Sequence, residues 1–191
     1  MSNYRRARIG GATFFFTVVA FGRRPILTNG DAPDWLSSAW KATCRERPFK
    51  TVAMVLLPDH LHCLWQLPEG DEDFSTRMRL IKARFTHAFL AGADSKESCR
   101  PARRLRGERD VWQPRFWEHT IRDDDDFGRH VDYVHWNPVK HGHARQAFDW
   151  PYSTFRRFVA RGIYEPDWGS VEPEVLRGMD LEGEWTERKG T

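Results

Sequence analysis

The segment 50–67 constrains the fold of this chain more than any other part of the sequence. Lys50–Leu57 is mostly apolar, and His60–Leu67 is a second apolar segment of the same length. Pro58 and Asp59 stand between the two, and both residue types favour a tight turn. We therefore predict a β-hairpin here, with Lys50–Leu57 as a central strand that is buried on both faces.

The rest of the chain alternates between helical and extended patterns. Apolar residues three or four positions apart indicate helices, and runs of β-branched and aromatic residues indicate strands. In chain order we expect a strand Thr13–Phe21, a helix from Asp31 or Asp34 to Arg47, the hairpin, a helix Phe74–Leu90, a strand Arg115–Ile121, a helix that begins at Asp123–Asp126 and reaches Pro138, and a short helix Ser153–Arg161. This order predicts an α+β fold, a four-stranded antiparallel sheet with helices on one face.

Length and composition limit the class of protein. The chain has 191 residues, of which 40% are hydrophobic, and this is enough for one domain with a core of its own. We expect a single domain over residues 1–164 and an acidic tail over residues 165–191. No apolar run reaches the roughly 18 residues that a membrane span needs, so no membrane partner is expected. Three scattered cysteines suggest no disulfide framework and favour the reducing cytoplasm.

The net charge of +3 conceals two regions of opposite sign. From Glu165 onward the chain has eight acidic and three basic residues, whereas residues 1–164 have 27 basic and 19 acidic ones. A basic body suits a polyanionic partner such as nucleic acid. The alternative is that these charges only keep the protein in solution, and the charge alone does not decide between the two.

His60 and His62 are the first candidate site. Side chains alternate between the two faces of a strand, so these histidines point the same way, while Leu61, Cys63 and Trp65 point to the other face and can pack in the core. Two imidazoles on one face of a rigid hairpin can both ligate the same divalent cation. The alternative is a surface strand that carries two histidines by chance.

Tyr133 and Asn137 are the second candidate site. They are four residues apart in the predicted helix and therefore share a face. Next to a metal-bound phosphate a tyrosine hydroxyl can attack phosphorus and form a phosphotyrosine, and Asn137 can offer its amide oxygen to the metal. The alternative is a tyrosine that packs its ring on the sheet. Pro138 complicates the geometry of Asn137, because a residue before proline avoids the α region and often lies at a helix end.

Several blocks of the sequence, in one order, match a single family. They are Tyr4-Arg5-Arg6 with Gly10-Gly11, Phe14-Phe15-Phe16-Thr17, Met54–His62, Ile81-Lys82, Trp112-Gln113 with Phe116–His119, Tyr133 with Asn137–Gly142, and Trp150–Ser153. On these blocks the chain resembles the REP-associated tyrosine transposases, relatives of the single-tyrosine HUH insertion-sequence transposases. The resemblance covers residues 4 to about 168.

The resemblance implies a fold and a set of roles. The fold is of the HUH endonuclease type, with a ferredoxin/RRM-like antiparallel sheet, and His60 and His62 are its metal ligands. Tyr133 is the nucleophile, and Asn137 stands where related transposases carry a glutamine ligand. The implied cofactor is Mg²⁺ or Mn²⁺. The implied reaction is cleavage and rejoining of single-stranded DNA beside a hairpin of a repetitive extragenic palindrome (REP), through a 5′-phosphotyrosine. A monomer is implied, with the dimer of related insertion-sequence enzymes as the alternative.

Basic and aromatic side chains suggest how DNA would be held, because single-strand binding combines a basic track with stacking platforms. We expect basic contacts from three parts of the chain, namely the N-terminal arm with Arg5, Arg6 and Arg8, the helix 74–90 with Lys82 and Arg84, and the basic loop 92–110 with Arg103 and Arg104. Candidate stacking residues are Trp112, Phe116 and Trp117, although most tryptophans of such a chain lie in its core. His119 is interpreted as a structural histidine.

Two other functions remain open at the level of sequence. One is a non-catalytic binding protein, which holds DNA hairpins without cutting them. The other is a metal-dependent hydrolase in which water is the nucleophile, and this reaction gives a cut product without a covalent protein–DNA adduct.

Overall fold

The computed structural model describes residues 12–92, 111–177 and 179. The chain divides into two compact units. Unit 1 comprises Met1–Val52 and Leu56–Ile121, and unit 2 comprises Ala53–Val55 and Arg122–Thr191. Among the described residues, none of the helices combines the length and the apolar character that crossing a membrane requires.

A four-stranded sheet forms the framework of the fold. Its strands are β1 (Thr13–Val19), β2 (Lys50–Leu56), β3 (His60–Gln66) and β4 (Trp117–Thr120), in the order β2-β3-β1-β4. β1 is antiparallel to both β3 and β4, and Thr17 lies opposite His62 on one side and Trp117 on the other. Residues that lie opposite each other share a face of the sheet. This register therefore fixes which side chains of β1, β3 and β4 are neighbours.

The predicted hairpin is confirmed, but the position of its first strand is not. The turn is closed by a hydrogen bond from the Leu57 N–H to the His60 carbonyl oxygen at 2.8 Å. The prediction that Lys50–Leu57 is a central strand is wrong, because β2 lies at an edge of the sheet. Met54 exchanges hydrogen bonds with Thr154 instead. These bonds satisfy backbone groups of an edge strand, and apolar content alone cannot distinguish such a strand from a central one.

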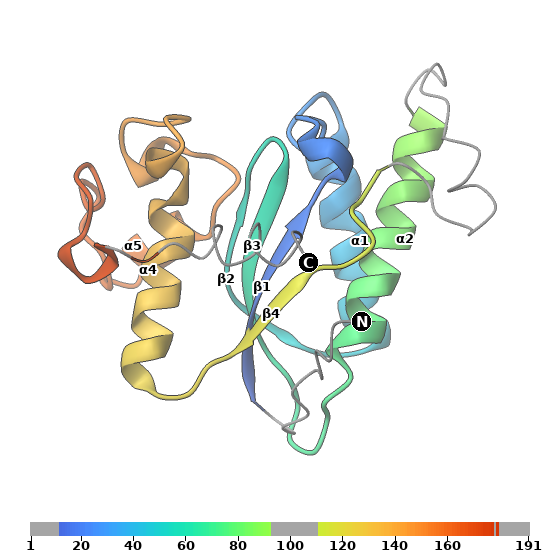
Figure 1. Cartoon of the computed structure of the whole chain (residues 1–191), viewed down its shortest axis with the longest axis horizontal. Helices are drawn as coiled ribbons and strands as arrows, with labels where there is room; N and C mark the ends of the chain where they lie inside the picture. The colour runs from blue at the N-terminus through green and yellow to red at the C-terminus, as the bar shows by residue number, and fades with distance from the viewer. Residues whose placement is uncertain (1–11, 93–110, 178, 180–191) are drawn as a thin grey trace, which may run out of the picture. The chain divides into compact units, whose positions relative to one another are not determined.

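One face of the sheet is the core of unit 1. Two helices, α1 (Ala32–Glu46) and α2 (Phe74–Gly92), run side by side against this face (Figure 1). Trp65 of β3 packs on Phe16 and Phe49, and the edge of its ring meets Trp40 of α1. Phe16 also contacts Phe74 of α2. Alternation along β1 and β3 thus gives one face to the core, as the sequence predicts, and leaves His60 and His62 on the other.

Unit 2 is built around the long helix α4 (Asp124–Lys140) and the short helix α5 (Phe155–Val159). Its core contains stacked aromatic rings, with Phe155 against Tyr164 and Trp168. Leu176, in the 3-10 helix η3 (Glu174–Leu176), is buried as well. Residues beyond Glu165 therefore take part in the core of unit 2, although their sequence is acidic and poor in structural signals.

Both helices that were predicted to begin at acidic residues do so, but only one of the two has a side-chain capping hydrogen bond. Asp123 precedes α4, and its side chain accepts a hydrogen bond from the backbone N–H of Asp126 at 2.8 Å. Asp124, Asp125 and Asp126 follow in the first turn, where the helix dipole favours negative charge. Asp31 also precedes its helix, but its side chain makes no capping hydrogen bond.

Candidate active site

The two histidines of β3 lie side by side on the sheet face opposite the core of unit 1. Their ring centroids are 4.8 Å apart and the ring planes are nearly perpendicular, at 81°. His60 is 1% exposed and His62 is 0% exposed. The prediction that both histidines share a face is confirmed by the register of β1 and β3. The alternative of a surface strand with two exposed histidines does not fit this burial.

Each ring of the pair is oriented through its Nδ1 atom. His60 Nδ1 lies 2.6 Å from Asp59 Oδ1, and His62 Nδ1 lies 2.9 Å from Thr17 Oγ1. Because a carboxylate only accepts hydrogen bonds, Nδ1 of His60 is the donor. Nε2 is then the atom that the neutral ring would offer to a metal, and a carboxylate behind a ligating histidine is the usual outer partner of such a site.

Asp59 is held as a carboxylate by its neighbours. Burial by itself raises the pKa of Asp59, but the hydrogen bond and charge of His60, followed by those of Arg23, outweigh it and lower the pKa of Asp59 to about 2. The guanidinium of Arg23 donates to Asp59 Oδ2 at 3.0 Å. Asp59 is therefore ionised at neutral pH and keeps the His60 ring in one orientation.

One face of α4 carries a continuous row of polar side chains. At about 100° per residue, spacings of three and four residues place this row within a narrow stripe of the helix surface. We call it the polar face of α4; it consists of Asp126, His130, Tyr133, Asn137 and Lys140. The first four of these are buried. Unit 2 therefore contains a buried polar stripe, which a helix selected for packing alone would avoid.

Tyr133 is buried, and a lysine contacts its hydroxyl group. Tyr133 is 1% exposed. Lys140 Nζ donates a hydrogen bond to Tyr133 Oη at 3.2 Å, and Nζ also lies 4.9 Å from the centre of the tyrosine ring. Lys140 was not among the residues predicted from the sequence. The signal that identifies it is the seven-residue spacing, which places it two turns after Tyr133 on the same face.

Asn137 is completely buried and its side-chain amide is unsatisfied. Its exposure is 0%, and neither Oδ1 nor Nδ2 has a hydrogen-bond partner among the described residues. A buried amide without a partner costs about 1–3 kcal/mol, so such a group usually has a ligand or a function. The helix does not end at Asn137, because α4 continues through Pro138 to Lys140. Asn137 is thus held on a full helical turn.

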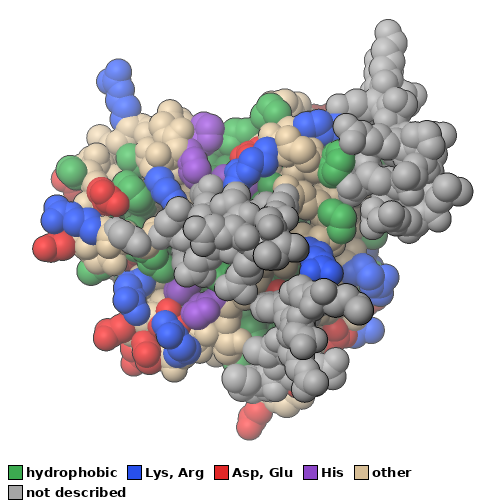
Figure 2. Space-filling view, in the orientation of Figure 1, with side chains coloured by type: hydrophobic (Ala, Val, Ile, Leu, Met, Phe, Trp, Pro, Cys, Tyr) green, Lys and Arg blue, Asp and Glu red, His purple; other side chains and the backbone are tan. Residues whose placement is uncertain are grey.

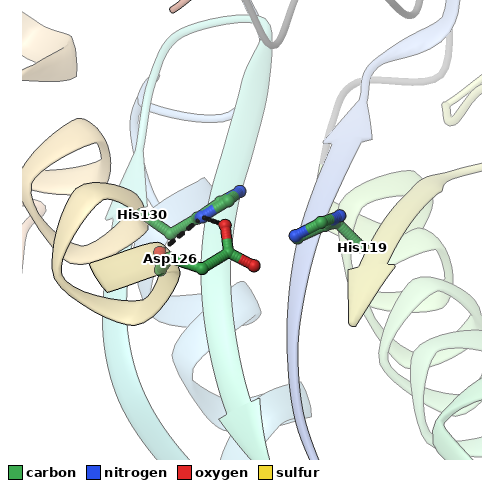
Figure 3. Close-up of side chains that lie close together, drawn as sticks. All are labelled: His119, Asp126 and His130. Carbon is green, nitrogen blue, oxygen red and sulfur yellow. Dashed lines mark hydrogen bonds and ion pairs between the residues drawn. The ribbon is translucent and has the colours of Figure 1, made fainter. Parts of the chain in front are cut away.

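Asp126 and His130 form a second polar pair on the polar face, which the sequence reasoning missed. His130 Nδ1 lies 2.8 Å from the Asp126 carbonyl oxygen and 3.2 Å from Asp126 Oδ1, as the dashed lines of Figure 3 show. Both partners are acceptors, so Nδ1 carries the hydrogen. Arg122 donates to the other carboxylate oxygen of Asp126 at 3.1 Å. His119, which Figure 3 also draws, lies on β4 of unit 1 and stacks on Trp117.

The other described tyrosines have environments that suit a nucleophile less well. Tyr164 donates a hydrogen bond to Asp132, and burial, followed by this bond and the charge of Asp132, raises the pKa of Tyr164. A phenol with a raised pKa yields less phenolate at neutral pH. Tyr152 is exposed and rests on the edge of Trp150. Tyr4 lies outside the described residues.

The predicted DNA-binding residues that the structure describes are engaged within unit 1. Lys82 Nζ donates to the carbonyl oxygen of Gln113 at 2.6 Å, and Arg84 donates to Thr43 and Glu46. Basic and acidic side chains are interspersed on the described surface in Figure 2 and do not form one block. The remaining candidates, Arg5, Arg6, Arg8, Arg103 and Arg104, lie outside the described residues.

The candidate stacking residues are mostly part of the core. Trp112 is buried against Phe85, and Trp117 is buried with its ring at an angle to Phe15. Phe116 is half-buried and contacts Phe16. The alternative stated for the tryptophans, a place in the core, holds for Trp112 and Trp117, because both rings are buried against other aromatic side chains.

The sequence and the fold match known proteins over nearly the whole chain. A REP-associated tyrosine transposase of Escherichia coli (strain K12) is 49% identical over 178 residues, which are 93% of this chain and 97% of the relative. A relative from Haemophilus influenzae is 44% identical over 184 residues, 93% of this chain and 99% of the relative. A solved REP-associated tyrosine transposase bound to a REP hairpin has a TM-score of 0.74 at 46% identity, covering 92% of this chain and 96% of that one. No protein-family model matches the chain.

These matches first define the class of the protein, which is an enzyme, a tyrosine transposase. More narrowly, an identity of 49% over 93% of the sequence means that the chain belongs to the REP-associated tyrosine transposases. The family resemblance seen in the sequence blocks is thereby confirmed. The likeness to the solved structure also confirms the α+β fold with helices packed on an antiparallel sheet.

Proposed function

We propose that this transposase is a metal-dependent endonuclease and strand transferase that acts on single-stranded DNA. His60, His62 and Asn137 hold a divalent cation, Mg²⁺ or Mn²⁺, and Tyr133 is the nucleophile. The substrate is DNA with a REP-type hairpin, and the intermediate is a 5′-phosphotyrosine. The alternative function of a hairpin-binding protein without activity is less well supported, because the side chains for catalysis are buried and oriented.

The observation that carries this proposal is the histidine pair of β3. Both rings are buried, lie with centroids 4.8 Å apart and are fixed through Nδ1 by Asp59 and Thr17. Rings held in this way offer Nε2 at positions that strand β3 and these hydrogen bonds fix. Two imidazoles with a carboxamide oxygen are a ligand set that Mg²⁺ or Mn²⁺ accepts when water and phosphate complete the shell.

The unsatisfied amide of Asn137 supports the third ligand. Its buried Oδ1 has no hydrogen-bond partner among the described residues, and a metal would satisfy it. Asn137 follows Tyr133 by one helical turn, so a ligand on Asn137 and the nucleophile project from the same face of α4. The chemistry requires that these two residues and the histidines act on the same phosphodiester.

The side chains of this chain divide the chemical work. A bound divalent cation would polarise the phosphodiester and offset the charge of the transition state. Tyr133 Oη attacks phosphorus, the bond between phosphorus and the 3′-oxygen breaks, and the leaving strand ends in a 3′-hydroxyl. The phosphotyrosine keeps the energy of the broken bond, so a free 3′-hydroxyl can attack it and restore Tyr133 without a nucleotide cofactor.

The hairpin substrate rests on the relatives and on the charge of the body. A related transposase has been solved bound to a REP hairpin, and residues 1–164 have 27 basic and 19 acidic residues. We propose contacts to the DNA backbone from Lys82 and Arg84, and from Arg5, Arg6, Arg8, Arg103 and Arg104. The proposed acting form is a monomer that acts on DNA in the cytoplasm.

A covalent-adduct assay tests this function. The full chain is incubated with an end-labelled single-stranded oligonucleotide that contains a REP hairpin, in Mn²⁺, and is then separated under denaturing conditions. We expect a protein–DNA adduct with the wild type, and a loss of at least about a thousand-fold in its rate for Tyr133→Phe, as for the removal of other nucleophiles. Tyr152→Phe, which changes an exposed tyrosine, is the matched control and should behave as the wild type does.

The outcomes separate the three functions. DNA binding without product or adduct would support the non-catalytic hairpin-binding protein. Product without adduct, retained in Tyr133→Phe, would support a hydrolase that uses water. Cleavage that persists in EDTA would remove the metal from the mechanism, and normal Mn²⁺ affinity in His60→Ala would remove His60 from the ligand set.

A further inference from the structure

Lys140 places a charged group in contact with the hydroxyl of Tyr133. Its Nζ atom donates to Tyr133 Oη at 3.2 Å and lies 4.9 Å from the ring centre. Both residues belong to α4, seven positions apart, and Tyr133 is buried. The contact is therefore set by the geometry of one helix and depends on no loop.

The chemistry of a tyrosine nucleophile gives this contact a purpose. A free phenol has a pKa near 10, so the reactive phenolate is scarce at neutral pH, whereas a lysine side chain is cationic there. An ammonium at hydrogen-bond distance stabilises negative charge on the oxygen, and in a buried site this attraction is stronger than in water. The proposed metal ligands act on the phosphate, and Lys140 acts at the other reacting atom.

We propose that Lys140 is a catalytic residue that stabilises the negative charge of the Tyr133 oxygen during cleavage and during rejoining. The inference rests on the proposed function of Tyr133 and names a new group for the same site. Before the attack the phenol proton passes to water, and the Lys140 ammonium remains protonated throughout. The bond from Oη to phosphorus then forms, the bond from phosphorus to the 3′-oxygen breaks, and the 3′-oxygen takes a proton from water.

The same contact serves the reverse reaction. When a 3′-hydroxyl attacks the phosphotyrosine, Tyr133 is the leaving group and departs as a phenolate. Lys140 is then placed at the atom on which charge develops. One residue thus lowers both barriers, and the two rates should change by a similar factor when it is replaced, because they share a transition state.

The first test replaces the charge and keeps the rest of the protein. In single-turnover assays on the labelled hairpin DNA, we expect Lys140→Met to lower the rate of adduct formation about a hundred-fold, the typical effect of losing one electrostatic donor. Lys140→Gln keeps a hydrogen-bond donor without a charge and should be similarly slow, whereas Lys140→Arg should recover most of the rate. Lys41→Met removes an exposed lysine from α1 and is the control, with unchanged rate and DNA affinity.

The second test changes the acidity of the nucleophile. With 3-fluorotyrosine at position 133, the phenol ionises more readily and needs the cation less. We expect this substitution to reduce the defect of Lys140→Met several-fold, in adduct formation and in the rejoining of isolated adduct. A lysine that only packs on the tyrosine ring would give a defect that does not respond to fluorination.

The results distinguish a failure of this inference from a failure of the proposed function. If the wild type and Lys41→Met form no adduct, Tyr133 is not the nucleophile, and Lys140 has no such role either. If they form the adduct and Lys140→Met or Lys140→Gln keeps the wild-type rate, the role of the Lys140 charge is overturned. Weaker hairpin binding with an unchanged rate at saturating DNA would instead mean that Lys140 is a phosphate contact.

Discussion

The two faces of α4 differ in their residues, and we assign function to one face and stability to the other. Its polar face presents Tyr133, Asn137 and Lys140, with a buried amide that has no hydrogen-bond partner among the described residues. The opposite side, which we call the packed face, consists of Val131, Val134, His135 and Pro138, and all four are buried. The polar face carries a buried amide that costs stability, whereas the packed face is mostly apolar and its histidine makes a hydrogen bond through Nε2.

His135 shows the difference most directly, because histidine occurs on both faces. Its Nε2 lies 2.9 Å from Thr154 Oγ1, and its ring is enclosed by Phe155, Phe158 and Tyr164. Burial, and then the charge of Arg157, lower the pKa of His135 to about 3. A histidine kept neutral within aromatic rings is a core residue. Residue type alone therefore does not identify a site, and the surroundings of the side chain decide its role.

The largest expected effect tests the contacts of the packed face, because Phe155 of α5 packs on its His135. Phe155 is fully buried and stacks on Tyr164 and Trp168. We expect Phe155→Ala to lower the free energy of unfolding by about 3–5 kcal/mol, through lost burial and the cavity that remains. Urea unfolding followed by tryptophan fluorescence measures this, and Phe148→Ala, at a half-buried position, should cost clearly less. If the packed face only supports the helix, the rate of adduct formation per folded molecule should not change in Phe155→Ala. A large loss of that rate would contradict the division of α4 into a functional and a stabilising face.

A smaller effect of opposite kind is expected on the polar face. Asn137→Ala should reduce Mn²⁺ affinity at least about tenfold, as measured by calorimetry. The same variant should raise the free energy of unfolding without metal by about 1–3 kcal/mol, because an unsatisfied buried amide disappears. Gln146→Ala removes an exposed amide of unit 2 and is the control. Unchanged Mn²⁺ affinity in Asn137→Ala would exclude it as a ligand.

The last expected effect concerns pH and sharpens the role of His135. In the unfolded chain His135 takes up a proton near pH 6.5, whereas in the folded protein its pKa is about 3. The unfolded state therefore binds more protons between these values. The contribution of His135 to the free energy of unfolding is fully present above about pH 6.5. It falls by about 1.4 kcal/mol for each unit by which the pH is lowered between the two pKa values.

The pH dependence is measured by urea unfolding from pH 7 to pH 4. His135→Gln keeps a neutral hydrogen-bonding group opposite Thr154 and should show a flatter dependence than the wild type, since the remaining titrating groups are common to both. Equal slopes for the two proteins would mean that His135 is protonated in the folded state as readily as in the unfolded one.

Local regularities of the sequence determined a large part of the site. The period of two along 60–66 placed His60 and His62 on one face and Trp65 on the other, and the helical period placed Tyr133 and Asn137 together. The tight turn at Pro58-Asp59 and the acidic start of α4 also followed from residue types alone. These features depend only on residues that are close together in the chain, so the sequence alone is enough to predict them. The same helical period contains Lys140, Asp126 and His130, although only the burial of the stripe draws attention to them.

Contacts between distant segments were decided by the tertiary structure. Thr17 orients His62 across 45 residues of sequence, and Met54 exchanges hydrogen bonds with Thr154 across 100 residues. β2 is an edge strand, where apolar content predicted a central one, and the latter contact satisfies backbone groups on its outer side. Trp112 and Trp117 became core rings for the same reason, since burial depends on which segments meet. The sequence by itself thus determined the faces on which His60, His62, Tyr133 and Asn137 lie, and tertiary packing decided which side chains orient, satisfy or cover them.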